Sequence, residues 1–160
     1  MKILFICTHN RCRSILAEAI TNHYGKGLVK AASAGSEPEG KVHPLTLEVL
    51  KEMGIPTSQL HSKSWDELEG FEPDFVITVC DKASREQCPL WFGMSLRAHW
   101  SLKDPSSLKP GSKKQREAFM QTAQIIRDRV EKLCELLASD PDRTTILGAL
   151  QSMNENYQLV

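Results

Sequence analysis

Short apolar runs alternate along this chain with stretches in which apolar residues recur at helical spacing. The runs Lys2–Ile6 and Phe75–Val79 are nearly continuous in apolar residues, and Leu28–Ser33 and Leu96–Trp100 are weaker ones. Runs of this length between turn-forming residues are typical of strands inside a covered sheet. The pattern therefore predicts four β-strands.

Three stretches between these runs have the spacing of helices. The first begins at Ser14 and stops at Gly25, and the second begins near Pro44 and stops at Gly54. Proline in the first turn and glycine just past the last turn are common helix boundaries. The third opens with the basic stretch Lys109–Arg116. Its apolar positions alternate steps of four and three and form one core-facing stripe: Phe119, Ala123, Ile126, Val130, Leu133 and Leu137.

The order of these elements favours an α/β fold, because strands that alternate with helices form a parallel sheet covered on both faces. We predict a single three-layer domain over residues 1–138, with a four-stranded parallel sheet flanked by helices, and a C-terminal extension over residues 139–160 with a short helix. Sites in such sheets lie at the carboxyl ends of the strands. Cys7, Cys80 and Trp100–Asp104 each follow a predicted strand, so we expect them at one edge of the sheet.

Composition narrows the classes of partner. Lys and Arg total 20 and Asp and Glu total 20, so the net charge is zero. Proteins that bind nucleic acid or anionic membranes through bulk charge are normally basic, so we expect neither partner. No run reaches the ~18 apolar residues of a membrane helix, and no signal peptide is evident, so we expect a cytoplasmic protein. The five cysteines are too sparse for a disulfide scaffold and suit a reducing compartment.

The segment Cys7–Ser14, called the anion loop below, connects the first predicted strand to the first predicted helix. Its amides and the positive helix end can surround an anion, and Arg13 can hold two oxygens of that anion. The same groups are expected to lower the pKa of Cys7 below the ~8.5 of a free thiol, which makes it a thiolate nucleophile. Ser14 can donate a hydrogen bond to the Cys7 sulfur, and Asn10 can hold the loop through a left-handed backbone.

The anion loop resembles the phosphate-binding loop of low-molecular-weight protein tyrosine phosphatases. Over about residues 1–137 the chain is more similar to the arsenate reductases built on that fold, because it also has Ser33-Ala34-Gly35, Thr78-Val79-Cys80 before Cys88-Pro89, and His99-Trp100 before Asp104-Pro105. The resemblance implies reduction of arsenate to arsenite, with no tightly bound cofactor and with an external thiol donor, either thioredoxin or glutathione with glutaredoxin. It implies that the oxyanion is bound by Thr8, His9, Asn10, Arg11, Cys12, Arg13 and Ser14.

The resemblance also implies an order for three cysteines. Cys7 attacks arsenic, and Cys80 then displaces arsenite by forming a disulfide with Cys7. Cys88, in the polar loop that begins at Asp81, attacks Cys80 in turn, and the resulting Cys80–Cys88 disulfide carries the oxidation outward. Packing of Cys80 at a strand end, with Cys88 incidental, is the alternative. A zinc site of Cys80, Cys88 and His99 lacks a closely spaced ligand pair, and we predict no metal site. His99 is expected to be packed.

Asp104-Pro105 supplies the candidate general acid. Asp104 would protonate the leaving oxygen, a role that calls for a raised pKa. An ordinary Asp-Pro turn is the alternative.

A phosphatase that hydrolyses phosphotyrosine through a phosphorylated Cys7 is the rival function. Against it, Ser106-Ser107 stands where phosphatases commonly have aromatic residues. A third possible function is that of a non-catalytic module that binds an oxyanion.

Two departures from the resemblance bear on the loop. His9 stands where glycine is usual, and its imidazole could add a donor over the anion. Some relatives bind potassium beside this loop, and Asn10, Glu18 and Ser33 match that site. Lys63 or Ser64 stands where the remaining Asp is expected, so we do not predict potassium.

Overall fold

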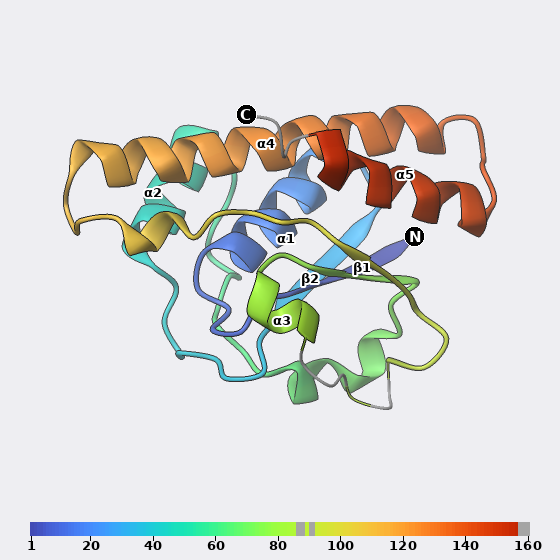
Figure 1. Ribbon diagram of the computed structural model, residues 1–160, viewed down its shortest axis with the longest axis horizontal. Coiled ribbons are helices and arrows are strands. Elements are labelled where there is room, and N and C mark those ends of the chain that lie inside the picture. Colours follow the sequence, from blue (N-terminus) through green and yellow to red (C-terminus); the bar gives the residue numbers. More distant parts are fainter. Residues whose placement is uncertain (86–88, 90–91, 157–160) are drawn as a thin grey trace.

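Four parallel strands form the centre of the computed structural model, which describes residues 1–85, 89 and 92–156 (Figure 1). The strand order is β2-β1-β3-β4, so the first strand lies inside the sheet. The predicted α/β class and the parallel sheet are confirmed. The first strand has its predicted range, and the other three differ from theirs by one or two residues at their ends. The bounds are β1 (Lys2–Ile6), β2 (Lys30–Ala34), β3 (Phe75–Thr78) and β4 (Leu96–His99).

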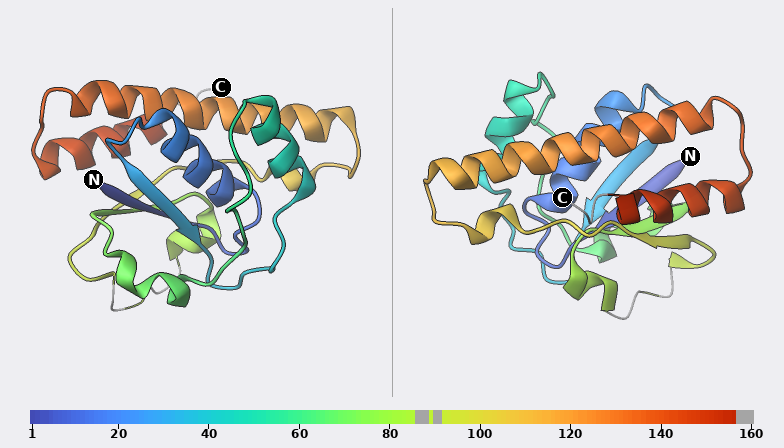
Figure 2. Two further views of the ribbon diagram at one scale, coloured as in Figure 1. Left: turned by 180° about the vertical axis from the view of Figure 1, so that it is seen from behind. Right: turned by 45° about the horizontal axis from the view of Figure 1, so that its top comes forward.

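The predicted helices are present. Helix α1 lies between the strands and the long helix α4, as Figure 2 shows from two sides. Helix α2 packs against α1 and α4. The bounds are α1 (Arg13–Tyr24), α2 (Pro44–Glu52) and α4 (Lys113–Leu137).

Local signals explain where two of these helices begin. The His43 side chain accepts a hydrogen bond from the Leu45 amide (3.1 Å) ahead of Pro44, which starts α2. The Ser112 hydroxyl accepts one from the Gln115 amide (3.2 Å), so α4 begins at Lys113 rather than at Lys109. Such caps satisfy amides that have no partner inside the helix.

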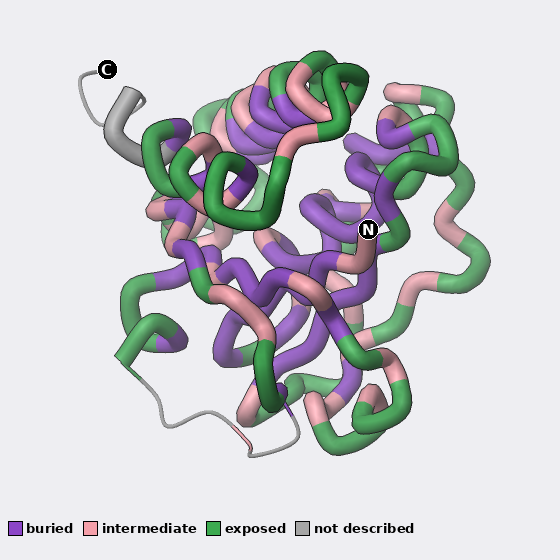
Figure 3. The backbone as a smooth tube through the Cα atoms, turned by 90° about the vertical axis from the view of Figure 1, so that its right-hand side faces the viewer, coloured by how far each residue is buried: buried purple, intermediate pink, exposed green. Residues whose placement is uncertain are grey.

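The core-facing stripe of α4 is confirmed for its first five members, which are buried, whereas Leu137 is only partly buried. Each large apolar side chain buried in this way contributes about 1.5–3 kcal/mol. Figure 3 shows the buried residues along the strands and the inner turns, with exposed residues on the outer turns. The sheet edge that carries the candidate site is therefore held by a well-covered core.

Three elements differ from the sequence expectation. The first residues of the predicted polar loop after Cys80 form a short helix, α3 (Asp81–Arg85), and 3-10 helix η1 (Trp65–Phe71) was not predicted. The expected short helix near the end is the 14-residue α5 (Arg143–Asn156), which packs against β4. The Trp100 indole donates a hydrogen bond to the Leu150 carbonyl (3.0 Å) inside that contact. The boundary at residue 138 stays a prediction.

Among the described residues, no helix is both long enough and apolar enough to cross a membrane.

Candidate active site

The carboxyl ends of the strands bring the candidate residues together, as predicted. Cys7 follows β1 and Cys80 follows β3, and the two thiols are hydrogen-bonded to each other. Asp104 follows β4, and its carboxylate lies 3.8 Å from the Arg13 guanidinium and 3.9 Å from the Cys12 sulfur. Residues as far apart in the chain as Cys12 and Asp104, which are separated by 92 positions, thus meet at one sheet edge.

Asn10 holds the anion loop in shape. It has a left-handed backbone, with φ of 47°, and is fully buried. Its side-chain amide donates to the hydroxyls of Ser14 (2.8 Å) and Ser33 (3.0 Å), and its side-chain oxygen accepts from the Lys63 amide (2.9 Å). The expected role of Asn10 in fixing the loop is confirmed. Donation from Ser14 to Cys7 stays a prediction.

A buried ion pair supports the loop from behind. The Ser33 hydroxyl donates to Glu18 (3.0 Å), and the Lys63 ammonium lies 3.3 Å from the same carboxylate oxygen. Lys63 also donates to the His61 carbonyl (3.1 Å). The charge of Glu18, which matches the potassium site of the resemblance, is therefore compensated by a side chain of this protein.

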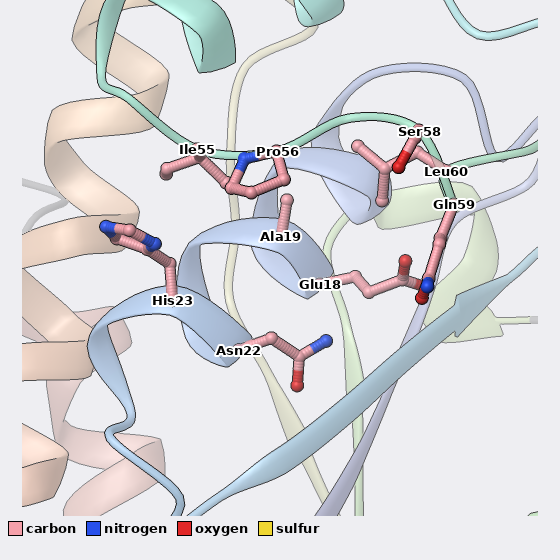
Figure 4. Close-up of a pocket in the computed structure, with 9 residues that line it drawn as sticks. All are labelled: Glu18, Ala19, Asn22, His23, Ile55, Pro56, Ser58, Gln59 and Leu60. Carbon is pink, nitrogen blue, oxygen red and sulfur yellow. The ribbon is translucent and has the colours of Figure 1, made fainter.

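A pocket of about 380 Å³ opens beside α1 on the side of Glu18 (Figure 4). It is lined by residues of α1 and of the segment 55–60, with Asn22 and His23 among them. Neither Cys7 nor Arg13 lines it. The pocket therefore borders the support of the anion loop and not the reacting groups.

The two thiols share their protons unequally, and this overturns one expectation. The hydrogen bond from Cys7 lowers the pKa of Cys80 to about 5, whereas the same bond and burial raise the pKa of Cys7 above its ordinary value, against the influence of Arg13. The lowered pKa that the anion loop alone predicts for Cys7 is therefore not found while Cys80 shares the proton, although Arg13 still acts in the predicted direction. The sequence could not show that a second thiol lies against Cys7 and takes the negative charge.

Further donors hold the Cys80 thiolate. The Ala83 amide in α3 donates to its sulfur (3.4 Å), and the Thr8 hydroxyl lies 3.6 Å from it. Cys80 and Cys7 are equally well buried, with 4% and 5% of their surfaces exposed. Contact of Thr8 with Cys80 was not predicted, because it joins segments far apart in sequence.

Arg13 is oriented by two groups beyond β4. One guanidinium nitrogen donates to the Leu102 carbonyl (2.9 Å), and the other lies near Asp104. The Nε–H of Arg13 is buried and has no hydrogen-bond partner among the described residues. A buried donor without a partner is costly, and an oxyanion in the loop is a suitable acceptor for it.

Asp104 does not have the raised pKa that its expected role calls for. Burial alone would raise the pKa of Asp104, but hydrogen bonds from the Ser106 hydroxyl (2.6 Å) and amide (3.0 Å) and the nearby Arg13 charge hold it below its usual value. Asp104 caps the 3-10 helix η3 (Pro105–Ser107), with Pro105 in the first position. The Asp-Pro-Ser order is the signal that could have shown this cap.

The remaining loop side chains lie around the rim. Arg11 pairs with Glu39 (3.1 Å) and donates to the Ser106 hydroxyl (2.8 Å). His9 is exposed and lies 3.2 Å from the Glu37 carbonyl. Cys12 is buried, and burial together with the Asp104 charge raises its pKa.

Cys88 lies outside the described residues, so its place in the predicted order stays a prediction.

His99 is not simply packed, because its ring contacts Thr78 and Asp81. In residues 1–85, 89 and 92–156, no three His, Cys, Asp or Glu side chains gather as a metal site.

Comparison with known proteins identifies relatives over most of the chain. An arsenate reductase of Shouchella clausii is 35% identical over 136 residues, which is 83% of this chain and 94% of that protein. A glutaredoxin arsenate reductase of Synechocystis is 29% identical over 132 residues, which is 82% of this chain and 95% of that protein.

Solved structures of arsenate reductases and of a phosphatase also match this chain. An arsenate reductase in the phosphate binding state matches with a TM-score of 0.69 and 28% identity over 84% of this chain and 96% of that one. A thioredoxin-dependent arsenate reductase of Corynebacterium glutamicum matches with a TM-score of 0.63 and 32% identity, over 84% and 62%. A low molecular weight protein tyrosine phosphatase of T. tengcongensis matches with 0.69 and 29%, over 86% and 99%.

The family model described as low molecular weight phosphotyrosine protein phosphatase matches residues 2–143. This range contains the anion loop, both contacting thiols and Asp104. The fold resemblance found in the sequence is confirmed, and the chain belongs to the low molecular weight phosphotyrosine protein phosphatase family.

Proposed function

We propose that this protein reduces arsenate to arsenite with a pair of cysteines and an external thiol donor. The observation that carries the proposal is the hydrogen bond between Cys7, in the anion loop, and Cys80. Hydrolysis of a phosphate ester needs one nucleophilic thiol. Reduction needs two thiols that can join, because two electrons must pass to arsenic.

The anion loop binds the arsenate oxyanion. Its amides, the start of α1 and the buried Nε–H of Arg13 all favour negative charge at this place. Arg13 is already aimed by Leu102 and Asp104, so little reorganisation is needed when the anion arrives.

Cys7 is the nucleophile. The proton in the Cys7–Cys80 hydrogen bond moves to Cys80, which leaves the negative charge on Cys7. The Cys7 sulfur then bonds to arsenic, and an arsenic–oxygen bond breaks. Asp104 supplies the proton with which that oxygen leaves as water. A bound oxyanion raises the pKa of Asp104 by like-charge repulsion and so helps it to carry that proton.

Cys80 completes the reduction. It gives up the proton that it took from Cys7 to an oxygen of the arsenic adduct, and the resulting thiolate attacks the Cys7 sulfur, so that a sulfur–sulfur bond forms while the sulfur–arsenic bond breaks. The electron pair of the broken bond stays on arsenic, which leaves as arsenite, and the two cysteines are oxidised to a disulfide. Cys88 then attacks Cys80, which returns Cys7 to the thiol and leaves a Cys80–Cys88 disulfide for the donor.

The donor belongs to a dithiol or glutathione system of the cytoplasm, where such thiols are kept reduced. Relatives named for glutaredoxin and for thioredoxin both match this chain, so either donor class fits. Thioredoxin suits a Cys80–Cys88 disulfide, whereas glutathione with glutaredoxin needs fewer cysteines from the protein.

One assay tests the function and the donor together. Arsenate-dependent oxidation of NADPH is measured with thioredoxin and its reductase, and separately with glutathione, glutaredoxin and glutathione reductase. We expect turnover in one arm and none in the Cys7→Ser variant, because a hydroxyl is barely ionised at neutral pH. No turnover in either arm, with hydrolysis of an aryl phosphate, would support phosphotyrosine hydrolysis through Cys7.

A further inference from the structure

The imidazole of His99 joins the residues on either side of Cys80. Its Nδ1 lies 2.7 Å from the Thr78 hydroxyl, at the end of β3, and its Nε2 lies 3.1 Å from the Asp81 carboxylate, at the start of α3. Thr78 and His99 are register partners on neighbouring strands. One side chain of β4 therefore fixes both ends of the Thr78–Asp81 segment, which contains Cys80.

The hydrogen-bond directions in this bridge follow from its chemistry. The Asp81 carboxylate can only accept, so Nε2–H donates to it, and in the neutral ring Nδ1 accepts from the Thr78 hydroxyl. The Ser101 hydroxyl contacts the same Asp81 oxygen at 3.5 Å. The bridge is partly open to solvent, with the His99 and Asp81 side chains 28% and 73% exposed.

The bridge bears on the position of the Cys80 sulfur. That sulfur is held by the Ala83 amide, and Ala83 lies in the first turn of α3, which Asp81 opens. If Asp81 is released from His99, α3 loses a side-chain tie to the sheet. The Cys80 sulfur and the donor that holds it then shift relative to Cys7.

We propose that His99, through Thr78 and Asp81, is a positioning residue that keeps the Cys80 sulfur in line with Cys7 for disulfide closure. The inference rests on the proposed function for its role in arsenate reduction, but the closure itself can be measured without arsenate. The hydrogen bonds of His99 within the described residues go to Thr78 and Asp81 and not to the Cys7 or Cys80 sulfur. His99 acts on the second step, in which Cys80 attacks Cys7, and not on oxyanion binding.

The closure is measured in a Cys88→Ser background, so that the bond stays at Cys7–Cys80. Diamide serves as oxidant: the two thiols lose two electrons and two protons, which reduce its nitrogen–nitrogen double bond to a hydrazine. The Cys7–Cys80 disulfide is followed by quenching, alkylation and peptide mapping. The same variants are then given one portion of arsenate without reductant, and released arsenite is measured.

We expect His99→Ala and Asp81→Ala each to slow closure by about tenfold or more, because small displacements of reacting atoms are costly. Lys82→Ala is the matched control, since Lys82 is in the same helix and its exposed pair with Glu37 (3.8 Å) does not involve the bridge. It should close at the rate of the background. His99→Gln, which can keep a donor toward Asp81, and His99→Asn, which can keep a polar atom toward Thr78, should each recover part of the rate.

Several results would overturn the inference: closure of His99→Ala at the background rate, equal slowing by Lys82→Ala, or no recovery by either amide variant. If His99→Ala fails to fold, the exposed Asp81→Ala decides the matter. A thermal midpoint lowered equally in the amide and alanine variants would indicate a merely structural role. Slowed diamide closure with no arsenite from the wild type would leave the inference standing and refute the proposed function.

Discussion

The Lys63 ammonium lies 3.3 Å from the Glu18 carboxylate, and both side chains are buried behind the anion loop, with 7% and 11% exposed. Glu18 also accepts from Ser33, which bonds to Asn10 of the loop. The pair therefore stands at the base of the hydrogen bonds that fix the loop. Its charge compensation depends on a lysine that comes from a different part of the chain.

Lys63→Met is expected to destabilise the protein by about 3–5 kcal/mol, because it leaves the buried Glu18 carboxylate without its partner. Urea unfolding measures this loss. Lys63→Met with Glu18→Gln should recover a large part of it, since the amide carries no charge to be compensated. A double variant as unstable as the single one would contradict this account of the pair.

The Cys7–Cys80 bond leads to a prediction on thiol reactivity. With the pKa of Cys80 at about 5 and that of Cys7 raised, the pair should bear one negative charge from about pH 6 upward. Alkylation of the pair by iodoacetamide should therefore rise through about pH 5 and then level off. In Cys80→Ser, Cys7 loses its charged neighbour while Arg13 remains, so the pKa of Cys7 should fall below its wild-type value. Mapping of the alkylated peptides over pH checks both, and an unchanged Cys7 profile in the variant would contradict the pairing.

Ser106→Ala tests the environment of Asp104. Removing the 2.6 Å hydrogen bond takes away a group that holds the pKa of Asp104 down, so that pKa should rise. If Asp104 is the general acid, the alkaline limb of kcat/KM for arsenate should move to higher pH. Ser107→Ala is the control, because the Ser107 hydroxyl donates to the Asp104 backbone carbonyl (2.8 Å) and not to its carboxylate. Identical pH profiles for the two variants would argue against Asp104 as the acid.

Arg13→Lys should reduce the stabilisation of the transition state by about 2–4 kcal/mol. The ammonium of lysine keeps the charge but lacks the planar guanidinium that Leu102 and Asp104 orient toward the loop. The loss is read from kcat/KM for arsenate. Activity within a few-fold of wild type would show that the buried Nε–H of Arg13 is not an oxyanion donor.

The sequence predicted the sheet and the placing of the site, because both follow from local patterns. Apolar runs marked the strands, and parallel strands bring their carboxyl ends to one edge, so Cys7 and Cys80 were expected there. The protonation of the pair could not be predicted in the same way. It depends on the Cys7–Cys80 hydrogen bond, which joins residues far apart in the chain.

The same limit applies to the surroundings of other site residues. The contact of Lys63 with Glu18 and the bridge formed by His99 arise only from tertiary packing. Asp104 is a different case, since the serine that lowers its pKa is only two positions away. That cap could have been predicted from the sequence, and the expectation of a raised pKa overlooked it.

The order of the three thiols distinguishes a reductase from a phosphatase. Phosphoryl transfer needs Cys7, Arg13 and Asp104 but no second thiol, so slow hydrolysis of an aryl phosphate should persist in Cys80→Ser and Cys88→Ser. Arsenate turnover should be lost in both. In Cys80→Ser little intramolecular disulfide should form, since the expected attacking thiol is missing.

In Cys88→Ser, Cys80 can still attack Cys7, so one arsenite should be released and the enzyme should stop as a Cys7–Cys80 disulfide. The wild type, given arsenate and no reductant, should instead accumulate Cys80–Cys88, because thiol exchange moves the bond away from the buried Cys7. Peptide mapping after one turnover identifies each bond. Turnover of Cys88→Ser at the wild-type rate with thioredoxin would remove Cys88 from the relay and indicate a donor that attacks the Cys7–Cys80 bond directly. Normal reduction by both variants would refute the relay as a whole, since neither Cys80 nor Cys88 would then be needed to carry the electrons.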